Sequence, residues 1–347
     1  MSTTNEYHIE PGQSWEVDFF RPEDAEGVTR LFLSVYGEAY PIKTFIQPEV
    51  LIRENEAGRT ISSVARTPRG DIVGHTALFC SAPYGGIRES GAGLVHASYR
   101  AGGISRKVLE HCYEVAAVKS GVETAFGEAV CNHVFQQKIV YGLRFEYHAL
   151  EVDLMPASAY ETEKSAAGRV ATITAFRTYR PKPHRVFIPP GYEEAMEYLY
   201  SGLDDRREIL KGLRQPPADS RTRMDVSYFE FAQVARLAVW ESGADFASAL
   251  EREERKVLEK GAVVVQAFVN LGLPWVGDAV EVSRRRGYFL GGLLPRWFDQ
   301  DAILMQKILK RPDWEGIQLL ADRAKKIREI VEEDWRRVAR EDQKVRR

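Results

Sequence analysis

Apolar residues recur at helical spacing after Pro22, and this pattern predicts the first helix of the chain. Residues three and four positions apart share one face of a helix, so their side chains form a stripe that can be buried. The stripe consists of Val28, Leu31, Phe32 and Val35. Proline suits the first turn of a helix, and the acids Glu23 and Asp24 favour the positive end of its dipole. A short strand is expected just before this helix, at 16–21.

Apolar runs and turn residues predict the other elements of the first half. We expect helices at 48–56, 104–119 and 132–140. We expect strands at 60–65, 71–79, 92–97, 124–130 and 145–155. Gly121 follows the second of these helices, where a C-cap glycine belongs, and Asn132 is placed to cap the third. The first half is therefore predicted to be an α+β domain.

A glycine-rich turn separates the strand at 92–97 from the helix at 104–119. The start of a helix presents backbone N–H groups that lack partners within the helix, and such groups suit a phosphate. Gly102 and Gly103 have no Cβ, so a ligand can approach the backbone closely, and Arg100 adds a fixed positive charge. The turn is not a Walker loop, because no Gly-Lys-Ser/Thr follows, and it lacks the three-glycine spacing of the dinucleotide fingerprint.

The order strand, Arg-x-x-Gly-x-Ser, helix resembles the acyl-CoA loop of the GNAT N-acetyltransferases, whose pattern is Arg/Gln-x-x-Gly-x-Gly/Ala. Arg100 and Gly103 fill the first two places, and Ser105 departs from the pattern at the third. The element order over 15–156 (β, α, α, β, β, β, loop, α, β, α, β) is similar to that of the family. The resemblance implies a mixed sheet, with acetyl-CoA or another acyl-CoA as donor substrate and no metal.

The resemblance also implies which residues hold the donor. The pantetheine arm is expected to pair with the backbone of the strand at 92–97, and the thioester to lie where this strand splays from the next. The diphosphate is expected on the N–H groups of the turn, with Arg106 or Lys107 within reach of a phosphate. The expected donor-binding residues are Val95, Ala97, Arg100, Ala101, Gly102, Gly103, Ile104, Ser105 and Asn132.

The sequence offers several candidates for proton transfer. Glu128 lies in an otherwise apolar strand, where an acid is costly unless it is paired or functional, and it is the first candidate for the general base. His96 and His133 are alternatives, although a lone histidine is more often structural. The family's general acid is commonly a tyrosine four residues before a Gly-Phe pair, and Lys138 holds that place here. Tyr141, next to the glycine, is the remaining candidate for the acid.

The second half repeats part of this outline. We expect strands at 169–178, 225–231, 234–240, 262–269, 288–294 and 302–309. We expect helices at 192–200, 246–258, 276–285 and 313–340, the last as a solvated helix with weak ion pairs. The turn at 241–245 lacks the family's pattern, and Glu241 and Asp245 would repel a diphosphate. We therefore predict a degenerate second GNAT-like copy, with an unrelated α+β domain as the alternative.

Composition and length narrow the class of protein. The chain has 347 residues, of which 44% are hydrophobic, as is typical of a globular protein with two domains. Its net charge of -2 gives no general case for binding nucleic acid or a membrane. Cys80, Cys112 and Cys131 lie far apart, which argues against a zinc site and favours a reducing compartment. Because the N-terminus has no signal pattern, we expect a cytoplasmic protein.

The sequence thus predicts tandem domains and an N-acyltransferase. The expected divisions are a catalytic domain at 1–156, a connecting segment with a proline-rich linker at 157–220, and a degenerate copy with a C-terminal helix at 221–347. The enzyme would move an acetyl or other acyl group from CoA to an amine of a small molecule or peptide. Two alternatives stay open, a carrier-protein or aminoacyl-tRNA donor and a non-catalytic acyl-CoA-binding module. The second domain would shape the acceptor cleft or mediate homodimerisation.

Overall fold

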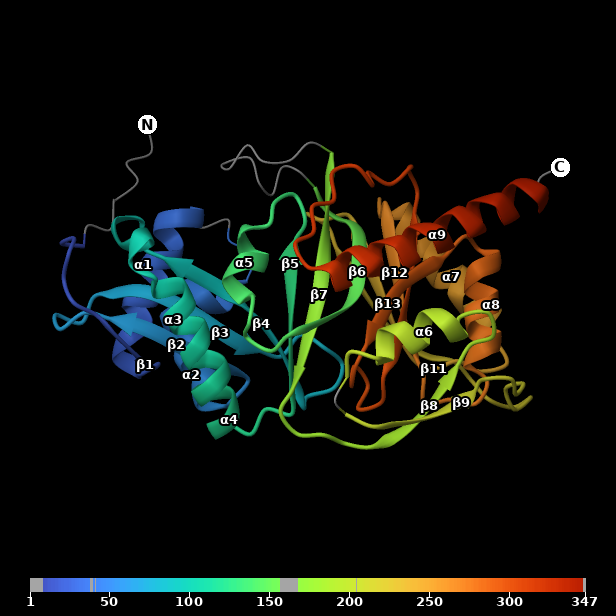
Figure 1. Ribbon diagram of the computed structural model, residues 1–347, viewed down its shortest axis with the longest axis horizontal. Helices are drawn as coiled ribbons and strands as arrows, with labels where there is room; N and C mark the ends of the chain where they lie inside the picture. The colour runs from blue at the N-terminus through green and yellow to red at the C-terminus, as the bar shows by residue number, and fades with distance from the viewer. Residues whose placement is uncertain (1–8, 38–39, 41, 157–167, 204, 346–347) are drawn as a thin grey trace. The chain divides into compact units, whose positions relative to one another are not determined.

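The computed structural model describes residues 9–37, 40, 42–156, 168–203 and 205–345 (Figure 1). The chain forms two compact units. The first holds Met1–Gly127 and Ile139–Arg144, and the second holds Glu128–Lys138 and Phe145–Arg347. The domain boundaries expected from the sequence, at 156/157 and 220/221, divide the chain by predicted fold repeats and not by compactness. They therefore stay a prediction.

The first unit contains a mixed sheet with the strand order β1-β2-β3-β4-β5. Its strands are β1 (Glu16–Phe19), β2 (Thr60–Arg66), β3 (Ile72–Phe79), β4 (Ile87–Val95) and the first part of β5 (Thr124–Val130). Its helical segments are η1 (Pro22–Asp24), α1 (Ala25–Tyr36), η3 (Lys43–Ile46), α2 (Pro48–Glu56), η4 (Ala97–Gly102), α3 (Ile104–His111), a π-helical turn (Cys112–Ala116) and α4 (Ala117–Lys119). Neighbouring strands are antiparallel except β4 and β5, which α3 connects in parallel.

Successive residues of β2 face opposite sides of this sheet. Val64 packs in one hydrophobic cluster with Leu31 of α1 and Leu51 of α2. Its neighbour Ala65 packs in another cluster with Val108 of α3. Side chains alternate between the two faces of a strand, so α1 and α2 cover one face and α3 covers the other. The turn between β4 and α3 therefore lies at the end of the sheet where β4 stops.

The second unit is built on a larger mixed sheet with the strand order β7-β6-β13-β14-β12-β11-β10. Its strands are β6 (Glu146–Pro156), β7 (Arg169–Thr178), β10 (Arg223–Phe229), β11 (Val234–Glu241), β12 (Val264–Asn270), β13 (Phe289–Leu294) and β14 (Ala302–Ile308). Its helices are α6 (Glu193–Tyr200), α7 (Phe246–Glu259), α8 (Val276–Arg285) and α9 (Asp322–Val345). Two further strands, β8 (His184–Ile188) and β9 (Arg207–Lys211), pair in parallel as a separate small sheet. Helix α5 (Phe135–Val140) begins in this unit and ends in the first.

One face of the second sheet carries the hydrophobic core, and the opposite face carries polar side chains. Leu237 of β11 and Ala267 of β12 are fully buried in the cluster that includes residues of α6, α7, α8 and α9. Arg236 and Gln266 precede them in the chain, so strand alternation turns these two side chains to the other face.

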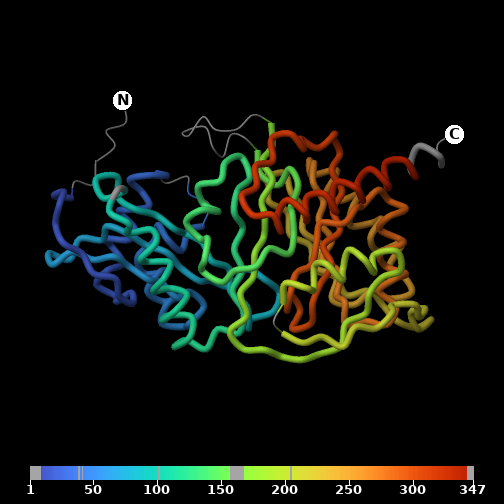
Figure 2. The backbone as a smooth tube through the Cα atoms, in the orientation of Figure 1, coloured from blue at the N-terminus to red at the C-terminus, as the bar shows by residue number. Residues whose placement is uncertain are grey.

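The C-terminal helix differs from the sequence expectation in position and burial. It begins at Asp322 rather than near 313, and it packs against β13 and β6 (Figure 2). Its buried apolar residues are Ala324, Ile327, Val331 and Val338. The expectation of a solvated helix is wrong because these apolar positions, three to seven residues apart, form a stripe between the charged positions.

The α+β class predicted from the sequence is confirmed, and several elements have the predicted bounds. These are α2, β5, β7 and α8. The parallel pair β8 and β9 was not expected, because each strand is short and follows a proline- or charge-rich stretch that gives no periodic pattern. Within the described part of the chain, no helix combines the length and apolarity needed to cross a bilayer.

Candidate functional site

The parallel strands β4 and β5 pair only over the first part of their length. The ladder runs from Ile87 opposite Thr124 to Glu89 opposite Phe126. β4 then continues to Val95, and β5 also continues beyond Phe126. Among the residues described, these three pairs make up the β4–β5 ladder, so the two strands part after Glu89. Beyond that point the ladder no longer occupies the edge of β4.

A β-bulge lies in β4 beyond this fork. Leu94 pairs with His75 and Gly91 with Ala77, so β4 has one more residue than β3 between these pairs. Ala92, within the bulge, has a positive φ of 52°, which is unusual for a residue with a side chain. The bulge bends β4 and changes the direction of the backbone groups that follow it.

A buried histidine holds the bulge. His75 is fully buried, and desolvation lowers its pKa to about 4, so the imidazole is neutral at neutral pH. Its Nδ1 lies 2.8 Å from the carbonyl oxygen of Ala92, which only accepts, so the proton is on Nδ1. Its Nε2 lies 3.1 Å from the hydroxyl oxygen of Ser62 and accepts from it. Thr76 also donates its hydroxyl to the carbonyl of Gly91 at 3.2 Å.

The last residue of β4 turns its backbone away from β3. The amide of His96 donates to the carbonyl of Val73 at 3.0 Å, and Val95 lies opposite Gly74. Hydrogen-bonded and non-bonded pairs alternate in an antiparallel ladder, so the N–H and C=O of Val95 point to the side away from β3. This is the side that an extended ligand would need. Ala97, which the sequence placed in the strand, instead begins η4.

The turn after β4 ends in an open glycine at the start of α3. Gly103 has a φ of +75°, a left-handed conformation that a residue without Cβ adopts at low cost. A Cβ built on Gly103 would meet no atom within 4 Å. The helix begins at Ile104, and its first intrahelical bond to the cap is the one from the amide of Lys107 to Gly103. Glycine has no side chain with which to cap the helix, so residue 103 leaves the first-turn amides without a side-chain acceptor of its own.

The basic residues around the turn differ in whether their side chains already bind groups of the chain. Arg100 is exposed on η4. Arg106 donates to the carboxylate of Glu110 at 2.8 Å and to the carbonyls of Ile139 at 3.0 Å and Tyr141 at 2.7 Å. Lys107 is within 2.9 Å of the same Glu110 carboxylate. Arg106 thus fixes the segment after α5, and Arg100 is the cation best placed to meet a ligand at the turn.

A cavity of about 610 Å³ lies along α3 next to this turn. Trp15 lines it, and the indole nitrogen of Trp15 would lie 3.9 Å from a Cβ on Gly102, so the same side chain borders both features. Its lining includes the cations Arg106 and Lys107 and the acids Glu16, Glu110 and Glu114. Because the acids outnumber the cations, the cavity favours an aromatic or polar neutral group over additional phosphate charge.

The other predicted site residues of the first unit are exposed or engaged locally. His96 has its Nδ1 2.8 Å from the hydroxyl of Ser98. Tyr141 is 69% exposed, and its backbone carbonyl is the acceptor for Arg106. These contacts do not hold the side chain of His96 or Tyr141 in the fixed position that proton transfer requires. The catalytic roles of both residues stay predictions.

Three predicted residues belong to the second unit. The Glu128 carboxylate lies 3.1 Å from the guanidinium of Arg236, which also lies 3.0 Å from the carboxylate of Glu151. Asn132 lies three residues before the first residue of α5, so its predicted role as the N-cap is wrong. The ring of His133 contacts that of Phe135, with the centroids 5.1 Å apart.

Sequence reasoning missed Arg236 and Glu151. Both are charged residues inside apolar strands, in the segments Val-Ala-Arg-Leu-Ala-Val and Ala-Leu-Glu-Val. The criterion that selected Glu128, an acid in an otherwise apolar strand, would have selected these two residues as well.

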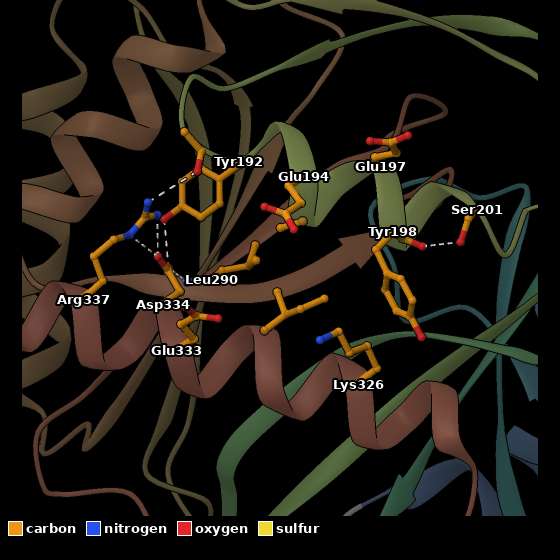
Figure 3. A pocket seen from close by; sticks show the side chains of 13 residues that line it. Tyr192, Glu194, Glu197, Tyr198, Ser201, Leu290, Lys326, Glu333, Asp334 and Arg337 are labelled. Atoms are coloured by element: carbon orange, nitrogen blue, oxygen red, sulfur yellow. Dashed lines mark hydrogen bonds and ion pairs between the residues drawn. The ribbon is translucent and has the colours of Figure 1, made fainter.

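A second cavity, of about 540 Å³, lies between α6 and α9 in the second unit (Figure 3). The carboxylate of Asp334 in its wall accepts hydrogen bonds from Tyr192 at 2.9 Å, Arg284 at 2.9 Å, Arg337 at 2.6 Å and the amide of Leu290 at 2.7 Å. The carboxylate is therefore saturated by groups from α8, α9, β13 and the residue just before α6. Its role is to join α9 to α6, α8 and β13, and it has no spare acceptor for a substrate.

Comparisons with known proteins give matches in structure alone. No protein-family profile matches the chain, and no curated protein does. An N-acetyltransferase from Staphylococcus aureus Mu50 covers 48% of this chain and 98% of its own, at 13% identity and a TM-score of 0.39. A putative acetyltransferase from Salmonella typhimurium, solved with its cofactor acetyl-CoA, covers 49% of this chain and 96% of its own, at 12% identity and a TM-score of 0.39. The ribosomal-protein-S18-alanine N-acetyltransferase from Escherichia coli covers 49% of this chain and 96% of its own, at 15% identity and a TM-score of 0.38. Each of these three structures aligns with about half of this chain, so the chemistry of the chain has to be inferred from its own residues.

Proposed function

We propose that the chain is an acyl-CoA-dependent N-acyltransferase with one donor site, formed by β4, the turn and α3. The observation that carries the proposal is the open surface over Gly103, where a Cβ would meet nothing within 4 Å. The backbone amides at the start of α3 follow this residue directly, and a diphosphate is a group that such helix-start amides bind well. Arg100 adds positive charge at the turn, whereas acids outnumber cations in the lining of the neighbouring cavity.

The strand fork supports an acyl donor rather than a simple nucleotide. A pantetheine arm carries two amides, and it can pair with the backbone of Val95, whose N–H and C=O point away from β3. The arm would place its thioester where β4 and β5 part, after Glu89 and Phe126. The adenine ring of the donor would lie toward Trp15 and the cavity along α3, whose lining suits an aromatic group.

The reaction is direct attack of a neutral amine on the thioester carbonyl. The C–N bond forms, the C–S bond breaks, and the electron pair of that bond leaves on the CoA sulfur as a thiolate. A general base takes the proton of the attacking amine, and the thiolate takes up a proton to give the thiol. Glu128 is the proposed base.

A second function, binding of acyl-CoA without catalysis, is favoured by one observation. The tyrosine position of the family's general acid holds Lys138, and the nearest tyrosine, Tyr141, is 69% exposed. An exposed phenol is not held against a leaving group, so the two functions differ in whether a thiolate is released.

Two measurements test the proposal. Calorimetry with CoA at neutral pH should show one site, and absence of binding would overturn both functions. Thiol release from acetyl-CoA is then measured with spermidine, L-lysine and a tripeptide that has a free N-terminus. Release above the hydrolysis rate in the absence of amine supports the transferase, whereas binding without amine-dependent release supports the binding module.

A further inference from the structure

Five strands of the second unit bring polar side chains together on one face of the sheet. Glu151 of β6 is 3% exposed and accepts hydrogen bonds from Gln266 of β12 at 2.6 Å and from Thr174 of β7 at 2.9 Å. Arg236 of β11 donates to the same carboxylate at 3.0 Å and to that of Glu128 of β5 at 3.1 Å. Buried carboxylates persist only where such partners replace water.

Arg236 is itself held in one place. Its Nε donates to the side-chain oxygen of Gln266 at 2.9 Å. The rings of Phe229 and Phe268 lie 5.7 and 5.8 Å from its guanidinium carbon, within the range of cation–π contacts. A guanidinium fixed on several sides sets the position of the carboxylates that it contacts.

The turn after β5 is held from the same half of the chain. The amide of Gln318 donates to the carbonyl of Cys131 at 2.6 Å, and the amide of Leu320 donates to the side-chain oxygen of Gln137 at 2.9 Å. Gln137 is fully buried and donates in turn to the carbonyl of Gln318 at 3.0 Å. Residues just before α9 therefore fix both ends of the segment between β5 and the middle of α5.

We propose that Arg236 is a positioning residue for the carboxylate of Glu128, the proposed general base. This inference rests on the proposed function, in which Glu128 takes the proton of the attacking amine. The guanidinium, fixed by Gln266 and two aromatic rings, holds the carboxylate in one orientation. Misplacing a reacting group by about 1 Å costs about 100-fold in rate, so loss of this contact should reduce turnover.

The charges of the cluster argue against a different role, capture of an anionic acceptor. Arg236 already faces the carboxylates of Glu128 and Glu151, so these three side chains carry one net negative charge. The guanidinium is thus already in contact with two carboxylates of the chain, and an anionic acceptor would have to compete with both.

The test compares two arginines of the second unit in the full-length protein. Arg236→Met removes the contact with Glu128, and Arg236→Lys retains the charge. Arg286→Met is the matched control, because Arg286 also pairs with a glutamate that is 3% exposed, Glu254, which keeps a second partner in Lys307. Glu128→Gln and the Glu128→Gln/Arg236→Met pair complete the set. Turnover and KM are measured with acetyl-CoA and the amine that gives the fastest release, and CoA affinity by calorimetry.

We expect Arg236→Met to lower kcat by about 10- to 100-fold with little change in KM or in CoA affinity, and Arg236→Lys to restore part of the loss. If Arg236 acts through Glu128, adding Arg236→Met to the Glu128→Gln variant should lower kcat by less than about threefold. The effects of two residues in contact are not additive.

Three results would overturn the inference while leaving the proposed function intact. They are a kcat for Arg236→Met equal to that of Arg286→Met, independent losses in the double variant, and a higher KM for the amine at unchanged kcat. A wild-type protein without amine-dependent thiol release would instead overturn the transferase function, and this inference with it.

Discussion

The segment β3-β4-α3-β5 of the first unit and the segment β10-β11-α7-β12 of the second share one connection pattern. In each, an antiparallel pair is followed by a helix and a strand parallel to the second member of the pair. They differ in how far the parallel strands stay together. β4 and β5 pair at three positions, whereas β11 and β12 pair at six, from Val234 opposite Val264 to Val239 opposite Val269. The fork that would admit a ligand in the first segment is closed in the second.

The turns before the two helices also differ, since the first is open to a ligand and the second is occupied by the chain itself. The surface over Gly103 is open, but a Cβ on Gly243 would lie 2.5 Å from the backbone of Arg221. The amide of Gly243 donates to the hydroxyl of Thr222 at 3.1 Å, and that of Ala244 donates to the hydroxyl of Ser220 at 3.1 Å. The chain's own linker thus occupies the amides that would otherwise meet a phosphate.

The end of β11 is also closed by side chains. Asn270 donates its side-chain amide to the carbonyl of Trp240 at 3.1 Å, and Trp275 donates its indole N–H to the carbonyl of Ser242 at 2.6 Å. A bulge also lies at Trp240, since Arg223 lies opposite Glu241 and Met224 opposite Val239. The comparison teaches that the same strand order and a bulge can occur both with an open turn and with a turn whose amides the chain itself occupies.

The largest expected effect is on CoA binding at the open turn. Gly103→Phe should weaken CoA binding on the order of 100-fold or more, because the ring would cover two or more charge-assisted hydrogen bonds of about 1.5–3 kcal/mol each. Calorimetry measures the affinity. Gly58→Phe is the control, since Gly58 also has a positive φ, of 66°, and nothing within 4 Å of a Cβ. Equal affinity of the two variants would count against the turn as the donor site.

The corresponding glycine of the second segment should behave in the opposite way. Gly243→Ala should lower the free energy of unfolding by about 2 kcal/mol, since its Cβ overlaps fixed backbone. CoA affinity and a stoichiometry of one per chain should not change. Denaturant unfolding and calorimetry on the same sample check both. A second CoA site, or an affinity loss in this variant, would break the comparison.

Acid should weaken the bulge of the first segment through His75. Its pKa is about 4 in the folded protein and about 6.5 in the unfolded chain, so the stabilisation is complete above about pH 6.5 and is lost as the pH falls toward 4. At pH 5 the loss is roughly 2 kcal/mol, from linkage. Unfolding free energies of wild type and His75→Gln between pH 8 and pH 4 measure it. Identical slopes for the two proteins would show that His75 is not the group responsible.

The smallest expected effect concerns the linker that occupies the second turn. Ser220→Ala removes the hydroxyl that accepts from Ala244, while the Ser220 carbonyl still accepts from the same amide at 3.2 Å. We expect a loss of about 0.5–1 kcal/mol in unfolding free energy and no CoA binding at this turn. Appearance of a second CoA site would mean that one hydroxyl, rather than the whole linker segment, excludes the ligand.

Local patterns predicted the elements that have strong end signals. Pro48 at the start of α2 and the apolar run of β5 gave bounds that match the structure. The donor turn was also recognisable, because its Arg100, Gly103 and helix start are adjacent in the sequence. The start of α9 was misplaced because Pro312 and Asp313 resemble a helix start, whereas this segment runs irregularly until Ala321.

The partners of the candidate base were out of reach of such patterns. Glu128 and Arg236 are 108 positions apart, and only the strand order of the second unit brings them within 3.1 Å. Periodicity also could not show that Gln137, an amide on a short helix, is fully buried by the segment at 318–320. Contacts of this kind depend on tertiary pairing, which one sequence does not reveal.

The linker residues 220–222 bind the amides of the turn at 243–244 and belong to the same chain as that turn. A tethered group competes at an effective concentration in the millimolar range or above when its tether is short. Ser220 and Ala244 are 24 positions apart in the chain, so a dissolved diphosphate would have to exceed that concentration to displace the linker. At lower ligand concentrations the amides of the second turn therefore stay bound to the hydroxyl groups of the chain's own linker.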